Sequence, residues 1–284
     1  MIYGYQQEEL RSYCRSCIES LEIWSRRIIH EKMVETYGEG FLDLVLDNGE
    51  YLIKKDIRNH VHQLKSSDST RIKRTVDALF LDDIIYFLCN PKWYSSLFKP
   101  ALDIVYPQGK DEAREFLTRL IPIRNSLSHS NPISVHDAER AICYTHDFVE
   151  GIKQYYRDRG KERMWNVPQI IRITDSRGNI FTDPESSALG ALYTITPEFH
   201  LGEEYSIVVD VDPSFERESY KILWEMHGAD IKEAQDKNTF QVKFSERDIA
   251  EQCYIGCKIL SNKSWHRYHD SDHTVVFVFS VLPL

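Results

Sequence analysis

The sequence predicts an α+β protein of two domains, an all-α helical domain over residues 1–160 followed by a β-sandwich over residues 161–284. Three observations lead to this prediction. The chain has 284 residues, a length typical of about two domains. Apolar residues recur every three or four positions up to about residue 158, as in amphipathic helices. Beyond Pro168 the apolar period changes to two, as in strands.

Helical spacing is clear at both ends of the first domain. Near its start the apolar residues step by three and four, at Leu10, Cys14, Cys17, Leu21 and Trp24. Near its end a second apolar face is formed by Phe116, Leu120, Ile123 and Leu127. We expect Asn131 and Pro132 to end that helix and Ser134 to cap the next one, with Asp137 at the third helical position.

The second domain reads as a series of short strands. A hairpin is predicted by alternating runs at 170–174 and 180–182 that flank the turn sequence at 175–179. Further runs occur at 205–211, 220–226, 239–244, 253–260 and 274–282. Six or seven short strands with regular turns are typical of a β-sandwich. The polar segment at 157–163, which contains a glycine, is the predicted boundary between the two domains.

Composition restricts the class of protein. With 42% apolar residues the chain is not wholly disordered, and no apolar run approaches the roughly 18 residues of a membrane-spanning helix. The N-terminus shows no signal-peptide pattern, so we expect a cytoplasmic protein with no membrane contact and with reduced thiols. Cys14 and Cys17 form half of a zinc motif, but no second pair follows downstream. We therefore expect buried thiols and no metal or cofactor.

The net charge of −9 argues at first against a nucleic-acid partner. Residues 1–160, however, contain 22 Lys and Arg against 24 Asp and Glu, whereas residues 161–284 contain 13 against 20. The acidity therefore belongs mainly to the β domain, where it favours a protein partner or an antitoxin. The nearly neutral helical domain leaves room for a local phosphate site.

One segment places three polar residues at the expected end of a helix and off its apolar face. It contains Arg124, followed directly by Asn125, with His129 five positions after the arginine. Histidine transfers protons near neutral pH, and arginine stays charged and presents a fork of donors to phosphate oxygens. A simpler alternative is that these residues only stabilise the helix end, where Asn and cationic side chains are favoured.

The Arg-Asn-x3-His pattern resembles the HEPN superfamily, whose ribonucleases carry Arg-x4–6-His, and the sequence over about 75–157 is similar to the Swt1-type variant. The resemblance implies a metal-independent endoribonuclease that leaves a 2′,3′-cyclic phosphate and a 5′-hydroxyl. In such an enzyme His129 would transfer the protons and Arg124 would stabilise the charge of the phosphorane. Asn125 would hold a phosphate oxygen or fix the histidine tautomer. It also implies a role in anti-phage defence or as a toxin. The alternative is a non-catalytic interaction protein, with the helical domain as a dimerisation scaffold and the β-sandwich as its recognition module.

Helical geometry bears on how such a site is assembled. Five residues of an ideal α-helix turn through about 500°, which leaves Arg124 and His129 roughly 140° apart. One protomer brings both groups together only if the helix bends or ends between them. Two protomers related by a twofold axis would place two such pairs in one cleft, as in HEPN nucleases. We therefore expect a homodimer with a composite site.

Other polar clusters in the helical domain carry weaker signals. Arg71, Lys73 and Arg74 belong to the one compact basic stretch and are candidates for RNA binding, although a solvated loop is the simpler interpretation. Asp82 and Asp83 would be an acidic pair near the site or merely a charged helix face. His60 and His62 are two positions apart on a predicted helix, so their side chains face different ways. This spacing argues against a shared metal site.

Two features stand out in the β domain. Trp224 on the run at 220–226, followed by Cys253 and Cys257, resembles the third and sixth strands of an immunoglobulin-like domain. The loop at 265–273 contains three histidines, two aspartates, a tryptophan and a tyrosine. It would bind a metal, stack on a base or sugar, contact a partner, or simply form an exposed hairpin.

Overall fold

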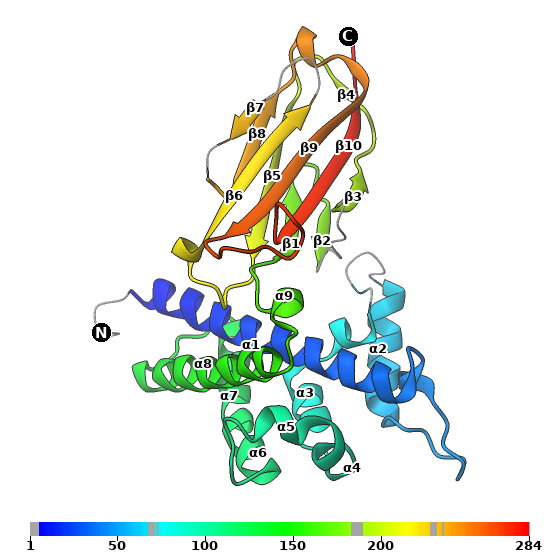
Figure 1. Cartoon of the computed structure of the whole chain (residues 1–284), viewed down its shortest axis with the longest axis vertical. Coiled ribbons are helices and arrows are strands. Elements are labelled where there is room, and N and C mark those ends of the chain that lie inside the picture. The colour runs from blue at the N-terminus through cyan, green and yellow to red at the C-terminus, as the bar shows by residue number, and fades with distance from the viewer. Residues whose placement is uncertain are drawn as a thin grey trace. The chain divides into compact units, whose positions relative to one another are not determined.

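The chain folds into an α+β structure with helices between residues 7 and 165 and strands between residues 170 and 282 (Figure 1). The computed structural model describes residues 6–67, 72, 74–182, 190–227, 232–234 and 236–283. Most contacts lie within one of two compact units, a helical unit (Met1–Gly160) and a sheet unit (Lys161–Leu284). The predicted α+β class is confirmed. No helix in the described part of the chain is both long and apolar enough to cross a membrane.

Two long helices and several short ones make up the helical unit. In chain order the elements are α1 (Gln7–Tyr37), the 3-10 turn η2 (Phe41–Asp43), α2 (Lys55–Ser67), the 3-10 turn η3 (Thr75–Ala78), α3 (Leu81–Leu88), α4 (Pro91–Trp93), the π-helical turn η4 (Tyr94–Phe98), α5 (Lys99–Leu102), α6 (Lys110–Thr118), α7 (Leu120–Ser128) and α8 (Val135–Asp158). Asn90 caps α4 through its side chain, with Pro91 at the first helical position.

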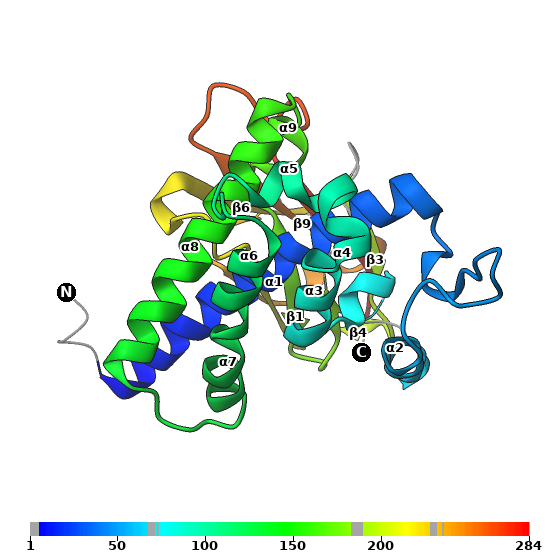
Figure 2. The same cartoon turned by 90° about the horizontal axis from the view of Figure 1, so that it is seen from below.

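Helices α1 and α8 form the centre of the helical unit and run parallel to each other (Figure 2). Cys14 Sγ lies 4.0 Å from the Ala138 carbonyl, and further along the Trp24 and Tyr156 rings lie 6.2 Å apart. Ser134 caps α8 by accepting a hydrogen bond from the Asp137 N–H, so the predicted cap is confirmed.

The sheet unit begins with the short helix α9 (Glu162–Trp165) and continues in strands. These are β1 (Ile170–Asp175), β2 (Ile180–Thr182), β3 (Ala191–Thr194), β4 (Phe199–His200), β5 (Glu204–Val211), β6 (Tyr220–His227), β7 (Lys232–Ala234), β8 (Thr239–Lys243), β9 (Ala250–Ser261) and β10 (His273–Leu282), with 3-10 turns η5 (Arg217–Ser219) and η6 (Glu246–Asp248). The predicted hairpin at 170–182 is present, and Gly178 takes the positive φ of 85° that its turn requires.

The strands form two sheets, ordered β2-β1-β5-β8 and β3-β10-β9-β6-β7, with β4 beside β10 (Figure 1). Inward-facing residues of both sheets share one hydrophobic core. Trp224 on β6 is buried in that core, and its ring stacks on Phe240 of β8 with the centroids 5.4 Å apart. Three strands, β3, β4 and β7, were not predicted, because a run of two to four residues is recognised only beside a clear hairpin turn, as β2 is.

The first residues of the sheet unit, directly after residue 160, are anchored to the loop between β9 and β10. Lys263, in the loop between β9 and β10, donates hydrogen bonds to the Asn166 carbonyl (2.7 Å) and to the Glu162 carboxylate (3.1 Å). Lys263 and Arg163 also lie against the Trp265 ring. Helix α9 is thereby attached to a loop that lies about a hundred residues further along the chain.

Candidate functional site

Helix α7 ends where the sequence predicts, and its last turn presents the candidate histidine. His129 is the C-cap residue, and Ser130 adopts a positive φ of 59°. The N–H of Asn131 donates to the Ser126 carbonyl (2.9 Å) and that of Ser130 to the Leu127 carbonyl (3.3 Å). This hydrogen-bond pair is a Schellman motif, which terminates helices through one left-handed residue. His129 is exposed, and its side chain has no hydrogen-bond partner among the described residues.

Arg124 lies one helical turn before His129 and is held against two other helices. Its Nε lies 3.6 Å from the Glu22 Oε1 of α1, and its guanidinium carbon lies 5.9 Å from the centroid of the Phe80 ring. The Arg124 side chain is 31% exposed and the Glu22 side chain 12% exposed. Within the described residues no hydrogen bond engages either Nη group of Arg124, so both remain available to a phosphate.

Glu22 connects two arginines. Its Oε2 accepts a hydrogen bond from Arg26 at 2.9 Å, while its Oε1 faces Arg124. Arg26 also donates to the Leu79 carbonyl at 2.7 Å, just before α3. Two arginines and one carboxylate leave a net positive charge here, because the carboxylate neutralises only one of the two guanidinium groups.

A third arginine of α1 lies at the end of α7. Arg15 donates a hydrogen bond to the Leu127 carbonyl at 2.8 Å, which satisfies one of the acceptors that every helix leaves unpaired at its C-terminus. Arg15 thus lies close in the structure to the segment that carries His129. Because α7 runs antiparallel to α1, Arg15 is near the end of α7 whereas Glu22 is near its middle.

Asn125 is exposed on α7, directly after Arg124. Its backbone carbonyl accepts the N–H of His129 at 3.1 Å. Asn125 and His129 therefore lie on one turn of α7. The side chains of Arg124 and His129 make no contact with each other in the described part of the chain. Arg124 is directed toward α1 and Phe80 instead.

A ring stack adjoins Arg124. The Phe80 and His60 rings lie with centroids 5.1 Å apart and planes 21° apart. The Asp83 carboxylate accepts the Phe80 N–H at 2.9 Å and lies 3.1 Å from His60 Nε2. Desolvation by burial raises the pKa of the Asp83 carboxyl, against the lowering effect of these partners. Asp83 is therefore not simply part of a solvated helix face, which was the simpler interpretation of its sequence.

Of the three residues predicted to bind RNA, the structure describes only Arg74. Arg71 and Lys73 lie outside the described residues. Arg74 is paired with Asp77 three positions later, through its Nη2 at 2.7 Å and its Nε at 3.1 Å. Its guanidinium is thus already engaged by a carboxylate, which favours the structural interpretation over phosphate binding. His62 lies 2.9 Å from Asp43, on a different side of α2 from the His60 contact with Asp83.

The loop between β9 and β10 is organised by one buried carboxylate. Asp272 is fully buried and accepts hydrogen bonds from the N–H groups of Ser261 (2.6 Å) and Arg267 (3.0 Å). His266 Nδ1 lies 3.0 Å from the same carboxylate. In the described chain, no group of three or more His, Cys, Asp or Glu side chains is placed to hold a metal. Asp272 therefore organises the conformation of this loop, while Lys263 anchors helix α9 to it.

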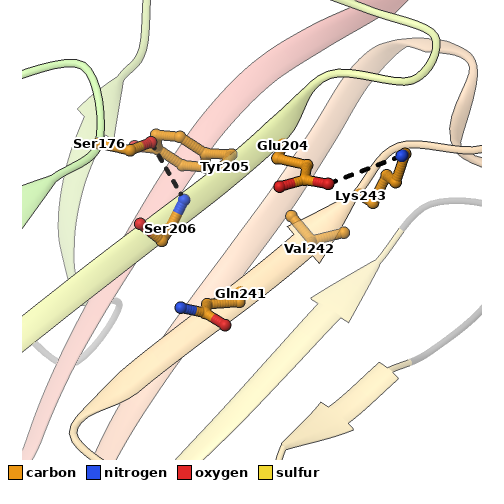
Figure 3. A pocket seen from close by; sticks show the side chains of 7 residues that line it. All are labelled: Ser176, Glu204, Tyr205, Ser206, Gln241, Val242 and Lys243. Carbon is orange, nitrogen blue, oxygen red and sulfur yellow. Dashed lines mark hydrogen bonds and ion pairs between the residues drawn. The ribbon is translucent and has the colours of Figure 1, made fainter.

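A shallow polar pocket lies on the four-stranded sheet, at β5 and β8 (Figure 3). It is lined by Ser176, Glu204, Tyr205, Ser206, Gln241, Val242 and Lys243. Glu204 and Lys243 face each other across the two strands at 3.6 Å, and the Ser206 N–H donates to Ser176 Oγ at 3.2 Å. Two polar contacts thus form within this pocket, and neither arginine nor histidine is among the residues that line it.

Comparison with known proteins leaves the family open. No protein-family model matches the chain, and no curated protein matches its sequence.

The partners of Arg124 were not predicted from the sequence, because they lie far away along the chain. Glu22 precedes Arg124 by about a hundred residues, and Phe80 precedes it by 44. The available signal was the spacing of Arg15, Glu22 and Arg26 by seven and four residues, which places them on one side of α1. That pattern alone is also typical of a solvated helix face.

Proposed function

We propose that the protein is a metal-independent endoribonuclease of the HEPN type, with Arg124, Asn125 and His129 as its catalytic residues. One observation carries this proposal. A histidine without a partner among the described residues is exposed at the end of a helix, and one turn earlier a positioned arginine keeps both Nη groups available.

The proposed chemistry assigns a separate role to each residue. His129 removes the proton of the 2′-hydroxyl or protonates the departing 5′-oxygen, because an imidazole exchanges protons near neutral pH. Arg124 stabilises the charge of the pentacovalent phosphorane through its Nη groups. Glu22 positions Arg124 by facing its Nε. Asn125 orients a phosphate oxygen from the same turn of α7. The products are a 2′,3′-cyclic phosphate and a 5′-hydroxyl.

The proposed enzyme is a homodimer. Within the described residues of one chain, Arg124 turns toward α1 while His129 is exposed and does not contact it. A twofold axis near the end of α7 would bring the His129 of one protomer to the Arg124 of its partner. Sedimentation at micromolar concentration should then give twice the 33.4 kDa of one chain. A single species at the monomer mass would contradict the composite site.

RNA cleavage in the presence of EDTA tests the catalytic role of His129. His129→Ala should lower the cleavage rate by about 10²- to 10⁴-fold, the usual contribution of a general acid or base. His136→Ala is the matched control, because His136 is also exposed and belongs to the same unit. An RNA with 2′-deoxy substitution at the cut site should resist cleavage. Equal cleavage by His129→Ala and wild type would show that the proposed site is wrong.

Mixing experiments test whether the site is shared between protomers. Arg124→Ala should lower the rate by about 10²- to 10³-fold, as the loss of a transition-state donor does, while the control Arg140→Ala should not. A mixture of the Arg124→Ala and His129→Ala proteins forms heterodimers in which one site keeps an intact arginine and histidine. Such a mixture should recover part of the activity. No recovery, with dimers present, would contradict a site built from both protomers.

The proposed biological role is anti-phage defence or toxin-like RNA cleavage. Induced expression of the wild-type chain in a bacterial host should arrest growth, because an endoribonuclease without a fixed partner degrades cellular RNA. The His129→Ala chain at the same level should not arrest it. Growth arrest by both chains would show that the toxicity does not depend on the proposed site.

We propose in addition that the sheet unit is an immunoglobulin-like domain. The order β1-β5-β8 matches the A-B-E strands of one immunoglobulin sheet, and β10-β9-β6-β7 matches the G-F-C-C′ strands of the other. Trp224 is buried on the strand that corresponds to C, opposite Cys257 on the strand that corresponds to F. No disulfide joins the two sheets, since all six cysteines are free.

One observation favours the alternative of a non-catalytic interaction protein. The outer face of the β3-β10-β9-β6 sheet carries the exposed apolar side chains of Leu192 (69% exposed), Leu223 and Tyr254 beside the Lys258–Glu225 ion pair. The outer face of the other sheet carries charged and polar groups such as the Arg172–Asp210 pair. Exposed apolar patches of this kind typically bind other proteins. If no RNA is cut while Leu192→Asp abolishes capture of a cellular protein, the scaffold function replaces the enzymatic one.

A further inference from the structure

Phe80 is an exposed aromatic residue directly before α3, at the N-cap position, where short polar residues are usual. Its side chain is 43% exposed although it contacts two other helices. The Asp83 carboxylate holds its backbone N–H at 2.9 Å, so the residue is fixed while its ring remains accessible. The ring thus presents a fixed apolar surface that a ligand could cover.

His60 supports the ring from one side. The two rings are nearly parallel at 21°, with centroids 5.1 Å apart. Both nitrogens of His60 lie against oxygen atoms, Nδ1 at 3.1 Å from the Asp56 carbonyl and Nε2 at 3.1 Å from the Asp83 carboxylate. Asp83 thus fixes both rings of the stack. Its carboxylate accepts the backbone N–H of Phe80 and faces the imidazole of His60.

Arg124 faces the Phe80 ring at a longer distance than a direct stack. The guanidinium carbon is 5.9 Å from the ring centroid, near the outer limit of a cation–π contact and well beyond a plane-to-plane stack. A planar group that stacks on the exposed part of the Phe80 ring would therefore lie next to the guanidinium. In a single-stranded RNA, a base in that position brings its own phosphate toward Arg124.

We propose that Phe80, backed by His60 and Asp83, is a stacking platform for one nucleobase of a single-stranded RNA whose phosphate binds Arg124. The inference rests on the proposed ribonuclease function and names the substrate class of the same site. Stacking on an aromatic ring tolerates any base, because every base has a π face. Recognition at this position is therefore largely independent of sequence, and purines bind more tightly because they cover more of the ring.

Binding measurements with an inactive protein test the platform separately from catalysis. In the His129→Ala background, the dissociation constant for a fluorescent eight-nucleotide single-stranded RNA is measured by anisotropy. Phe80→Ala should weaken binding about 5- to 100-fold, the usual effect of removing one aromatic stacking partner. Phe80→Leu should weaken it to a similar degree, because leucine keeps the apolar volume but has no π face. Phe80→Trp should retain or improve binding.

Tyr51 provides the matched control. It is 48% exposed, and it has its own arginine, Arg58, at 3.3 Å from its ring centroid. Tyr51→Ala should leave RNA affinity unchanged, whereas a general effect of losing an exposed aromatic would weaken binding in both variants. Thermal melting of each variant shows that the helical unit is folded.

The outcomes separate the platform from the catalytic proposal. Unchanged RNA affinity in Phe80→Ala and Phe80→Leu overturns the platform, even if His129→Ala abolishes cleavage and the enzyme is confirmed. Conversely, weaker binding in these two variants supports the platform even if the wild-type protein cuts no RNA, in which case only the proposed function is wrong. Failure of the His129→Ala protein to bind the oligonucleotide at all overturns the platform.

Discussion

Gly151 in the middle of α8 is predicted to resist the substitution that usually stabilises a helix. In most helix interiors, Gly→Ala is favourable by about 0.8–1.0 kcal/mol, because glycine has more backbone entropy to lose. Here an added Cβ would overlap Val105 Cγ2, and it would lie 3.6 Å from Val105 Cβ and 3.9 Å from Ile104 Cγ2. The glycine allows the segment after α5 to pack directly on α8.

The two effects oppose each other, and their sizes decide the sign. Forcing an extra carbon into a packed contact costs about 1–3 kcal/mol. Ile104 is exposed, so its segment is able to move outward in part, which places the cost near the middle of that range. After subtraction of the helix-propensity gain, Gly151→Ala should lower the free energy of unfolding by about 1 kcal/mol. For a unit of this size the melting temperature should fall by about 2–4 °C.

Thermal melting followed by the far-ultraviolet helix signal measures this change. Val105→Ala removes the atom that collides with the new Cβ and therefore serves as the internal control. The double variant Gly151→Ala, Val105→Ala should be more stable than the sum of the single changes predicts, with a coupling of about 1 kcal/mol. The reasoning is refuted if Gly151→Ala melts at or above the wild-type temperature.

Two further predictions concern titratable groups. Burial raises the pKa of the Cys14 and Cys89 thiols to about 11, while Cys143 is exposed on α8, so a thiol reagent at pH 8 should modify one cysteine quickly, and Cys143→Ser should remove that fast phase. Two fast thiols in the native protein would contradict the buried positions. The pKa of Asp236 is lowered below 3.8, because hydrogen bonds from the Ile222 N–H and Arg217 outweigh the opposing effect of burial. A lowered folded-state pKa gives stability that is complete above the unfolded value and is lost as the pH falls through the folded value. Urea unfolding should therefore show a smaller loss of stability below about pH 4 in Asp236→Asn than in wild type, and equal losses would contradict the assignment.

Local patterns predicted the local structure of the site well. The helix that carries Arg124 ends at Ser128, because Ser130 takes the left-handed conformation and the Asn131 N–H closes the Schellman motif. Ser134 caps the next helix as predicted. These features depend on hydrogen bonds between residues a few positions apart, so the sequence contains nearly all the information they need.

Patterns that are too short or too distant were not recognised. Strands β3 and β4 pair in parallel with β10, although β6, β7 and β9 of the same sheet lie between them and β10 in the chain. A strand of two to four residues has no measurable period, and its pairing is set by a neighbour far along the chain. Asp83 illustrates the same limit, because its contact with His60 depends on the packing of α3 against α2.

What the sequence determined by itself is the order and type of the main elements, the change from helices to strands near residue 160, and the residue types gathered at the end of α7. Only the tertiary structure decided which groups surround them. It placed Glu22 against Arg124 and Phe80 beside both Arg124 and His60, and it left His129 exposed. Periodicity and capping arise from neighbours in the chain, whereas the surroundings of a side chain depend on how whole helices pack together.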